Sequence, residues 1–113
     1  MEKSAMNTPD LPSFRMIVSS DGWTQVVHVT GELDLDTRDA FDRACFAGNE
    51  FDVVVDMSEL TFMDCAGYSG LVGTLVALEA IGGTLTIRAA VGQPRHLLDL
   101  LAHSEQHSTA KAA

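Results

Sequence analysis

An acid and a cysteine stand side by side at Asp64-Cys65, inside the segment LTFMDCAGYSGL that runs from Leu60 to Leu71. A cysteine at the start of a helix can act as a nucleophile, as a redox-sensitive thiol or as a contact residue. Nucleophilic catalysis would also need a base and an oxyanion site, and no histidine is close to Cys65 in the sequence. Helix capping by Asp64 would explain the acid without any chemistry. The pattern therefore favours a protein that is not an enzyme.

The other residue types that could carry chemistry form no recognised site. His103 and His107 are four residues apart, a spacing found in helical metal sites, but no third ligand accompanies them. Cys45 and Cys65 do not form a C-x-x-C pair, and Cys45 falls on an apolar helical stripe, which favours a buried thiol. The glycines lack the Gly-Lys-Ser/Thr element of a phosphate loop. We therefore expect no metal ion and no cofactor.

The charge of the chain restricts the class of partner. Sixteen acidic residues against seven basic ones give a net charge of −9. Nucleic acids and anionic membrane surfaces both require a basic face, so we expect neither as a partner. A protein with a basic face would instead gain from electrostatic steering. Acids gather between residues 32 and 42, and this cluster is either a solvated face or an electrostatic docking surface.

The length and hydropathy of the chain indicate one domain in the cytoplasm. A chain of 113 residues has room for one modest core. The N-terminus is polar, and no apolar run approaches the length that a bilayer requires. We therefore expect a cytoplasmic protein without membrane insertion, in which both cysteines are free thiols.

Hydrophobic periodicity predicts an alternation of strands and helices. The expected order is strand, strand, helix, strand, helix, strand, helix, at about 14–19, 23–30, 37–47, 51–58, 66–81, 84–88 and 94–101. The run Val53–Val55 does not alternate, which suggests a central strand covered on both faces. Residues 1–12 are expected to form a flexible arm, 13–102 the domain and 103–113 a polar tail. The alternation predicts an α/β domain with one mixed sheet and helices packed on it.

Two segments in this order resemble a known family. VTGELDLDT, from Val29 to Thr37, and the later LTFMDCAGYSGL are similar to the two motifs of the STAS domain. The chain is most similar to the single-domain bacterial anti-sigma factor antagonists. Their pattern is a strand, then Gly-Glu-hydrophobic-Asp, and later Asp-Ser-Ser/Thr-Gly at the opening of a helix. The resemblance covers about Phe14 to Leu101 and implies a STAS-type fold, a four-stranded mixed sheet with about three helices.

The resemblance also implies a function and a mode of control. Members of the family bind an anti-sigma factor, typically a serine kinase of the histidine-kinase-like ATPase class, and so release a sigma factor. The kinase ends this binding by phosphorylating the serine that follows the Asp. In this chain the phosphoacceptor position holds Cys65, and the next hydroxyl position holds Ala66. Ser69, one turn further on, aligns with a small residue. The resemblance thus implies an antagonist that is either non-phosphorylatable or redox-controlled.

The implied partner-binding surface has two parts. One is the acidic loop 31–37, and the other is the helix start 64–69. We expect Asp64 to cap and orient the helix, Cys65 to lie at the contact centre and Tyr68 to serve as an aromatic anchor. The full predicted partner-binding set is Glu32, Asp34, Asp36, Asp64, Cys65, Gly67, Tyr68 and Ser69. The expected oligomeric state is a monomer or weak dimer.

Two other functions remain open at the level of sequence. The first is a STAS subunit of a lipid-transport ABC system, in which the same surface would pack on an ATPase. The second is a ligand or redox sensor, in which Cys65 or a pocket near it would receive the signal.

Overall fold

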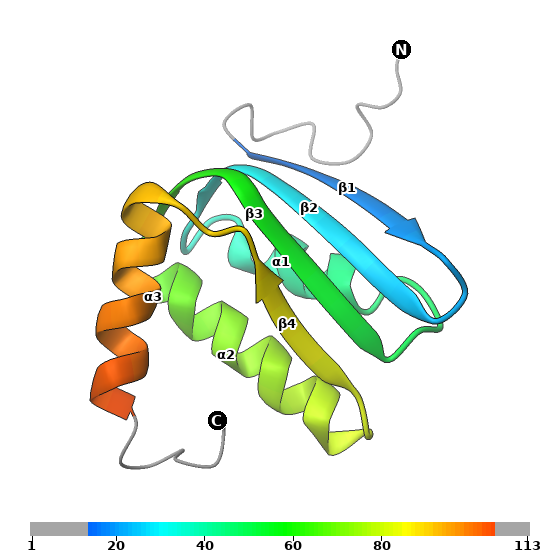
Figure 1. Ribbon diagram of the computed structural model, residues 1–113. Helices are drawn as coiled ribbons and strands as arrows, with labels where there is room; N and C mark the ends of the chain where they lie inside the picture. The colour runs from blue at the N-terminus through cyan, green and yellow to red at the C-terminus, as the bar shows by residue number, and fades with distance from the viewer. Residues whose placement is uncertain (1–13, 106–113) are drawn as a thin grey trace.

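The computed structural model describes residues 14–105, whose elements follow the predicted order (Figure 1). The strands are β1 (Phe14–Ser20), β2 (Thr24–Leu33), β3 (Asp52–Met63) and β4 (Thr84–Arg88). The helices are α1 (Arg38–Cys45), α2 (Cys65–Ala80) and α3 (Gly92–Glu105). The predicted fold, a four-stranded mixed sheet with three helices, is confirmed.

The sheet has the order β1-β2-β3-β4 and combines both kinds of pairing. β1 pairs antiparallel with β2, whereas β2, β3 and β4 run parallel to one another. The β1–β2 turn forms where predicted: the Asp21 carboxylate accepts the N–H groups of Trp23 and Thr24, and Gly22 has φ +93°. Because β2 and β3 are parallel and their pairing, after two register shifts, continues to Leu33 and Met63, the segments that follow them leave the same end of the sheet.

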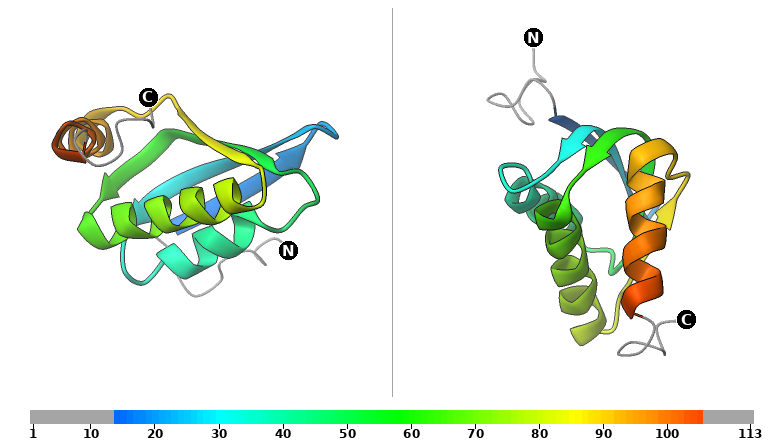
Figure 2. Two further views of the ribbon diagram at one scale, coloured as in Figure 1. Left: turned by 90° about the horizontal axis from the view of Figure 1, so that it is seen from below. Right: turned by 90° about the vertical axis from the view of Figure 1, so that its left-hand side faces the viewer.

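Two helices cover one face of the sheet (Figure 2). α1 and α2 lie side by side beneath the strands, and α3 stands at the end of the sheet where β3 finishes. Apolar side chains that alternate along the strands point toward α1 and α2 and form the core, as the pleat of a half-covered sheet requires. Its members include Val27, Val29, Leu33, Phe41, Val53, Val55, Met63, Leu71 and Leu78.

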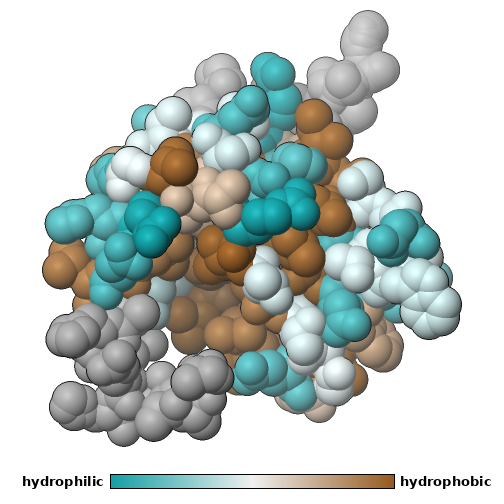
Figure 3. All heavy atoms as spheres, in the orientation of Figure 1, coloured by the Kyte–Doolittle hydropathy of each residue, from teal (hydrophilic) through white to brown (hydrophobic). Residues whose placement is uncertain are grey.

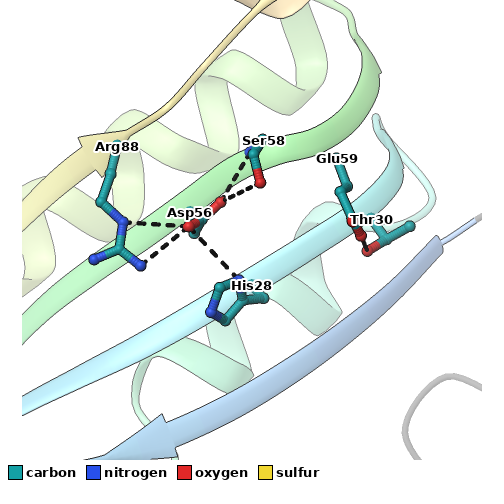
Figure 4. A network of polar contacts seen from close by, with 6 residues as sticks. All are labelled: His28, Thr30, Asp56, Ser58, Glu59 and Arg88. Carbon is teal, nitrogen blue, oxygen red and sulfur yellow. Dashed lines mark hydrogen bonds and ion pairs between the residues drawn. The ribbon is translucent and has the colours of Figure 1, made fainter.

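The opposite face of the sheet is open and carries a polar network (Figure 4). Asp56 lies at its centre and is only 8% exposed. Its Oδ2 accepts from Arg88 Nη2 at 3.0 Å and Nε at 3.2 Å, and His28 Nδ1 lies 3.7 Å away. Its Oδ1 accepts from the N–H and the hydroxyl of Ser58 at 2.9 and 2.7 Å. His28 is exposed on this face, whereas its neighbours Val27 and Val29 are buried on the other.

The open face corrects one prediction from the sequence. β3 is a central strand, but Val54 is only half-buried, so the strand is fully covered on the helix side alone. A space-filling view of the open face shows hydrophilic and hydrophobic residues mixed rather than a continuous apolar layer (Figure 3). The inner side chains of this run of valines pack in the core. The outer side chain packs against side chains of the neighbouring strands, a position that also favours a β-branched residue.

Element boundaries differ from the predicted ones in a few places. β2 continues to Leu33 and β3 to Met63, so Glu32 lies on a strand and not in the acidic loop. Trp23 precedes β2, and α3 continues to Glu105, past the predicted end of the domain. The predicted arm, 1–12, and the last part of the predicted tail, 106–113, lie outside the described residues.

Candidate partner-binding site

Asp64 is the single residue between the end of β3 and the start of α2. Its backbone is extended, with φ −106° and ψ −175°, and its side chain accepts the N–H of Gly67 at 2.8 Å. The Tyr68 N–H donates to the Asp64 carbonyl at 2.9 Å. This is the arrangement of an N-cap residue, which satisfies a helix donor that would otherwise have no partner. The capping role predicted for Asp64 is therefore confirmed.

The two cysteines have opposite environments. Cys65 is the first residue of α2 and its side chain is exposed. Cys45 lies on the inner face of α1 and is fully buried. Burial, with a smaller contribution from the Asp42 charge, raises the pKa of the Cys45 thiol to about 12. Because the thiolate is the reactive form, only Cys65 is available for chemistry at the surface of the described residues.

The loop between β2 and α1 packs directly on the start of α2. The Asp64 N–H donates to the Leu33 carbonyl at 3.3 Å. A Cβ at Gly67 would lie 2.0 Å from that same carbonyl oxygen, and one at Gly70 would lie 2.7 Å from the Cβ of Arg38. Gly67 therefore permits a close approach of α2 to the backbone at the start of the loop, and Gly70 permits a close approach to the Arg38 side chain at the start of α1. The two parts of the predicted surface are held together in this way.

The interior of this loop is fastened by its own side chains. Asp34 Oδ1 accepts the N–H groups of Asp36 at 3.0 Å and of Thr37 at 3.2 Å. The buried Thr37 hydroxyl donates to the Glu32 carbonyl at 3.0 Å and accepts the Asp34 N–H at 2.9 Å. The Asp34 carboxylate thus organises the loop, as an Asx turn does. Asp36 is exposed, whereas Glu32 is half-buried at the end of β2.

The predicted residues meet at one end of the sheet but differ in exposure. Ser69 is exposed, whereas Gly67 is buried against the loop. Tyr68 is half-buried and packs against the core, and the anchor role predicted for it stays a prediction. The exposed members of the predicted set are Asp36, Cys65 and Ser69.

The structure adds residues that the sequence did not indicate. Both atoms of the Gln93 side-chain amide bind Met63: Oε1 accepts the Met63 N–H and Nε2 donates to its carbonyl, each at 2.8 Å. This pair of hydrogen bonds fixes the strand end just before Asp64 and ties it to α3. Arg38 Nη1 lies 3.5 Å from the Ala66 carbonyl. No sequence pattern marks either contact, because each joins residues 28 to 30 positions apart.

Other kinds of site receive no support from the described residues. Within 14–105, no three His, Cys, Asp or Glu residues are grouped to hold a metal ion. None of the helices there is long and apolar enough to cross a membrane. A hollow of about 520 Å³ lies between β1 and α1, lined by Met16, Ile17, Val18, Ala40, Arg43, Ala44 and Ala47. None of the predicted site residues lines it.

Comparison with known proteins identifies the family. The model of the STAS domain matches residues 16–111, most of the chain. The chain belongs to the STAS domain family. A search of curated proteins gave no match.

Solved STAS structures share this fold. The anti-sigma factor antagonist from Mycobacterium paratuberculosis is 25% identical, with a TM-score of 0.67 over 83% of this chain and 82% of that one. The unphosphorylated anti-sigma factor antagonist SpoIIAA is 24% identical, with a TM-score of 0.62 over 78% and 81%. A STAS-like match also occurs in a murine anion transporter of solute carrier family 26, at 17% identity and a TM-score of 0.62, where it covers 73% of this chain and 14% of that one.

Proposed function

We propose that this STAS domain is an anti-sigma factor antagonist that acts by binding and not by catalysis. It binds an anti-sigma factor in the cytoplasm and so releases a sigma factor. The anti-sigma factor is a serine kinase of the histidine-kinase-like ATPase class. The contact surface is the loop between β2 and α1 together with the first turn of α2. Similar structures of single-domain anti-sigma factor antagonists support this function.

One observation carries the proposal: an exposed Cys65 directly after the capping Asp64. The resemblance to the family implies a phosphoacceptor serine at this position, and SpoIIAA of Bacillus has also been solved in a phosphorylated form. A phosphoryl group adds nearly two negative charges to a contact surface, and here it would stand beside Asp64. Cys65 and Ala66 offer no hydroxyl for a serine kinase, so this means of release is absent at this position.

The proposal predicts binding that is not controlled by phosphorylation. Each anti-sigma factor kinase of the source organism is purified and incubated with the chain and ATP. We expect one of them to form a stable complex while the intact mass of the chain stays unchanged. Cys65→Ser is the matched control, because it recreates the Asp-Ser pair and should gain the mass of one phosphate and lose binding.

Two outcomes would contradict the proposal. A phosphate mapped to Thr61 or Ser69, with loss of binding, would show that control by phosphorylation persists at another hydroxyl. A chain that binds none of the kinases, but binds the ATPase of a lipid-transport ABC system, would show that it is a transporter subunit. A STAS-like region within a transporter structure makes this the second candidate.

A further inference from the structure

Among the described residues, Leu35 and Phe62 are large apolar residues exposed at the end of the sheet that carries Cys65. Leu35 is 61% exposed in the loop between β2 and α1, and Phe62 is 40% exposed near the end of β3. Burial of such a side chain is favourable in water, so exposed ones on a rigid surface are available to a partner. Leu35 lies within the predicted loop 31–37, but neither residue is in the partner-binding set predicted from the sequence.

Leu35 is held in place by the loop around it. Its neighbours on both sides take part in the turn, in which Asp34 Oδ1 accepts the N–H groups of Asp36 and Thr37. The buried Thr37 hydroxyl ties the same turn to the end of β2. The loop is therefore fixed before any partner arrives, and ordering it on binding costs little.

Phe62 is held just as firmly from the other side. It lies opposite Glu32 in the β2–β3 ladder, on the face of the sheet turned away from the buried Met63. The Gln93 amide fixes the backbone of Met63, the next residue. A ring on a clamped strand end is a typical anchor for a protein interface, because little backbone entropy remains to be lost.

The charges around these side chains determine the kind of partner. Glu32 is the neighbour of Phe62 in the sheet. Asp34 and Asp36 stand on either side of Leu35 in the sequence. Asp64, the cap of α2, follows Phe62 by two residues. An apolar centre inside an acidic rim fits a face with the opposite charge. A second copy of the chain does not fit, because two-fold pairing would set these acids against themselves.

We infer that Leu35 and Phe62 are the apolar anchors of the partner-binding surface, and that the anti-sigma factor seats them in an apolar recess surrounded by basic side chains. This inference rests on the proposed function and assigns two tasks to different residues. The acids attract the partner and set the association rate. Leu35 and Phe62 hold the complex and set the dissociation rate.

The test measures association and dissociation rates for the purified anti-sigma factor kinase that binds the wild-type chain. The variants are Leu35→Ser, which suits a turn, and Phe62→Thr, which suits a strand. We expect each to raise the dissociation rate at least tenfold and to leave the association rate and its salt dependence unchanged. Leu35→Met and Phe62→Tyr keep the apolar area and should retain slow dissociation.

Trp23→Ser is the matched control for loss of an exposed apolar side chain. Trp23 is 82% exposed but precedes β2, at the end of the sheet away from Cys65. We expect it to leave both rates unchanged. Wild-type dissociation in Leu35→Ser and Phe62→Thr would overturn the inference and leave the proposed function standing. A wild-type chain that binds no anti-sigma factor would overturn both.

Discussion

At the scale of single residues, the two cysteines show how position decides chemistry. Both are free thiols of the same type, yet Cys45 is enclosed by the core and Cys65 stands at the surface beside a capped helix start. The apolar stripe containing Cys45 predicted its burial. The surface position of Cys65 followed from the family resemblance and not from a local pattern, because a helix N-terminus can face either the core or solvent.

Oxidation of Cys65 is expected to weaken binding to the anti-sigma factor. Hydrogen peroxide converts a thiol to a sulfenic acid, with water as the other product, and adds bulk and polarity at the proposed contact centre. A binding titration with and without peroxide should show a loss of affinity for the wild-type chain. Cys65→Ser should keep its affinity in peroxide when no ATP is present.

The control for this experiment is within the chain. Cys45 is fully buried, and its raised pKa keeps it protonated, so mass spectrometry should place the modification on Cys65 alone. Unchanged affinity for a chain shown to be oxidised at Cys65 would mean that the cysteine only prevents phosphorylation and does not sense oxidants.

The contribution of Asp56 to the stability of the fold depends on pH. Hydrogen bonds from the Ser58 N–H and hydroxyl, followed by those from Arg88, lower the pKa of Asp56 from 3.8 to about 2. The folded state therefore favours the ionised form, and this contribution to stability is present above about pH 4. It is lost as the pH falls toward 2, because the folded protein then binds the proton that the unfolded chain already holds.

Asp56→Asn should lower the free energy of unfolding by about 1–2 kcal/mol at neutral pH, because it removes the charge that Arg88 binds. Urea unfolding between pH 7 and pH 2 should show the gap between wild type and variant closing below pH 4. Asp99→Asn is the control, since Asp99 forms an exposed pair with Arg95, and such pairs contribute little to stability. A gap that stays constant down to pH 2 would show that the Asp56 charge does not stabilise the fold.

At the scale of elements, α2 combines two kinds of glycine. Gly67 faces the β2–α1 loop, where an added Cβ would lie 2.0 Å from the Leu33 carbonyl oxygen. Gly73 is exposed on the same helix, and an added Cβ there would meet nothing within 4 Å. Helical periodicity predicted a helix at about 66–81 but could not separate these glycines, because the loop that distinguishes them comes from another part of the chain.

Alanine substitutions at these two positions should have opposite effects on stability. Gly67→Ala forces the loop away from α2 and should lower the free energy of unfolding by about 2–3 kcal/mol. Gly73→Ala removes a residue with poor helix propensity and should raise it by about 0.5–1 kcal/mol. Urea unfolding of the two variants beside the wild type measures both changes. Equal effects of the two substitutions would mean that the loop does not pack on α2 as described.

At the scale of the whole molecule, the order of elements was predictable and the contacts between them were not. Alternation in some strands, the unbroken apolar run of residues 53–55 and the apolar stripes of the helices are local patterns, and they were enough to predict a mixed sheet with three helices. The clamp of Gln93 on Met63 and the extension of β2 to Leu33 depend on residues far apart in the chain. The acids near residue 34 had two possible roles in the sequence, and the structure separates Asp34, bound within its loop, from the exposed Asp36.

The difference between Asp34 and Asp36 decides which acids can be used to test electrostatic steering of the partner. Asp34 is unsuitable for a test, because its reversal would also break the turn that it organises. Glu32→Lys and Asp36→Lys each take the net charge from −9 to −7 at the proposed contact surface. Glu79→Lys makes the same change on an exposed position near the far end of α2. The three variants therefore differ in where the charge changes and not in how much.

Association with the anti-sigma factor should slow severalfold in Glu32→Lys and Asp36→Lys and remain near the wild-type rate in Glu79→Lys. Long-range attraction acts before contact, so dissociation should change less than association. Because the Debye length shrinks to about 8 Å at physiological ionic strength, the differences should diminish as salt is raised from 10 mM to about 150 mM. Stopped-flow mixing over this range measures them. If all three variants associate equally fast at every salt concentration, the acids at this end form a solvated face, and the apolar anchors alone select the partner.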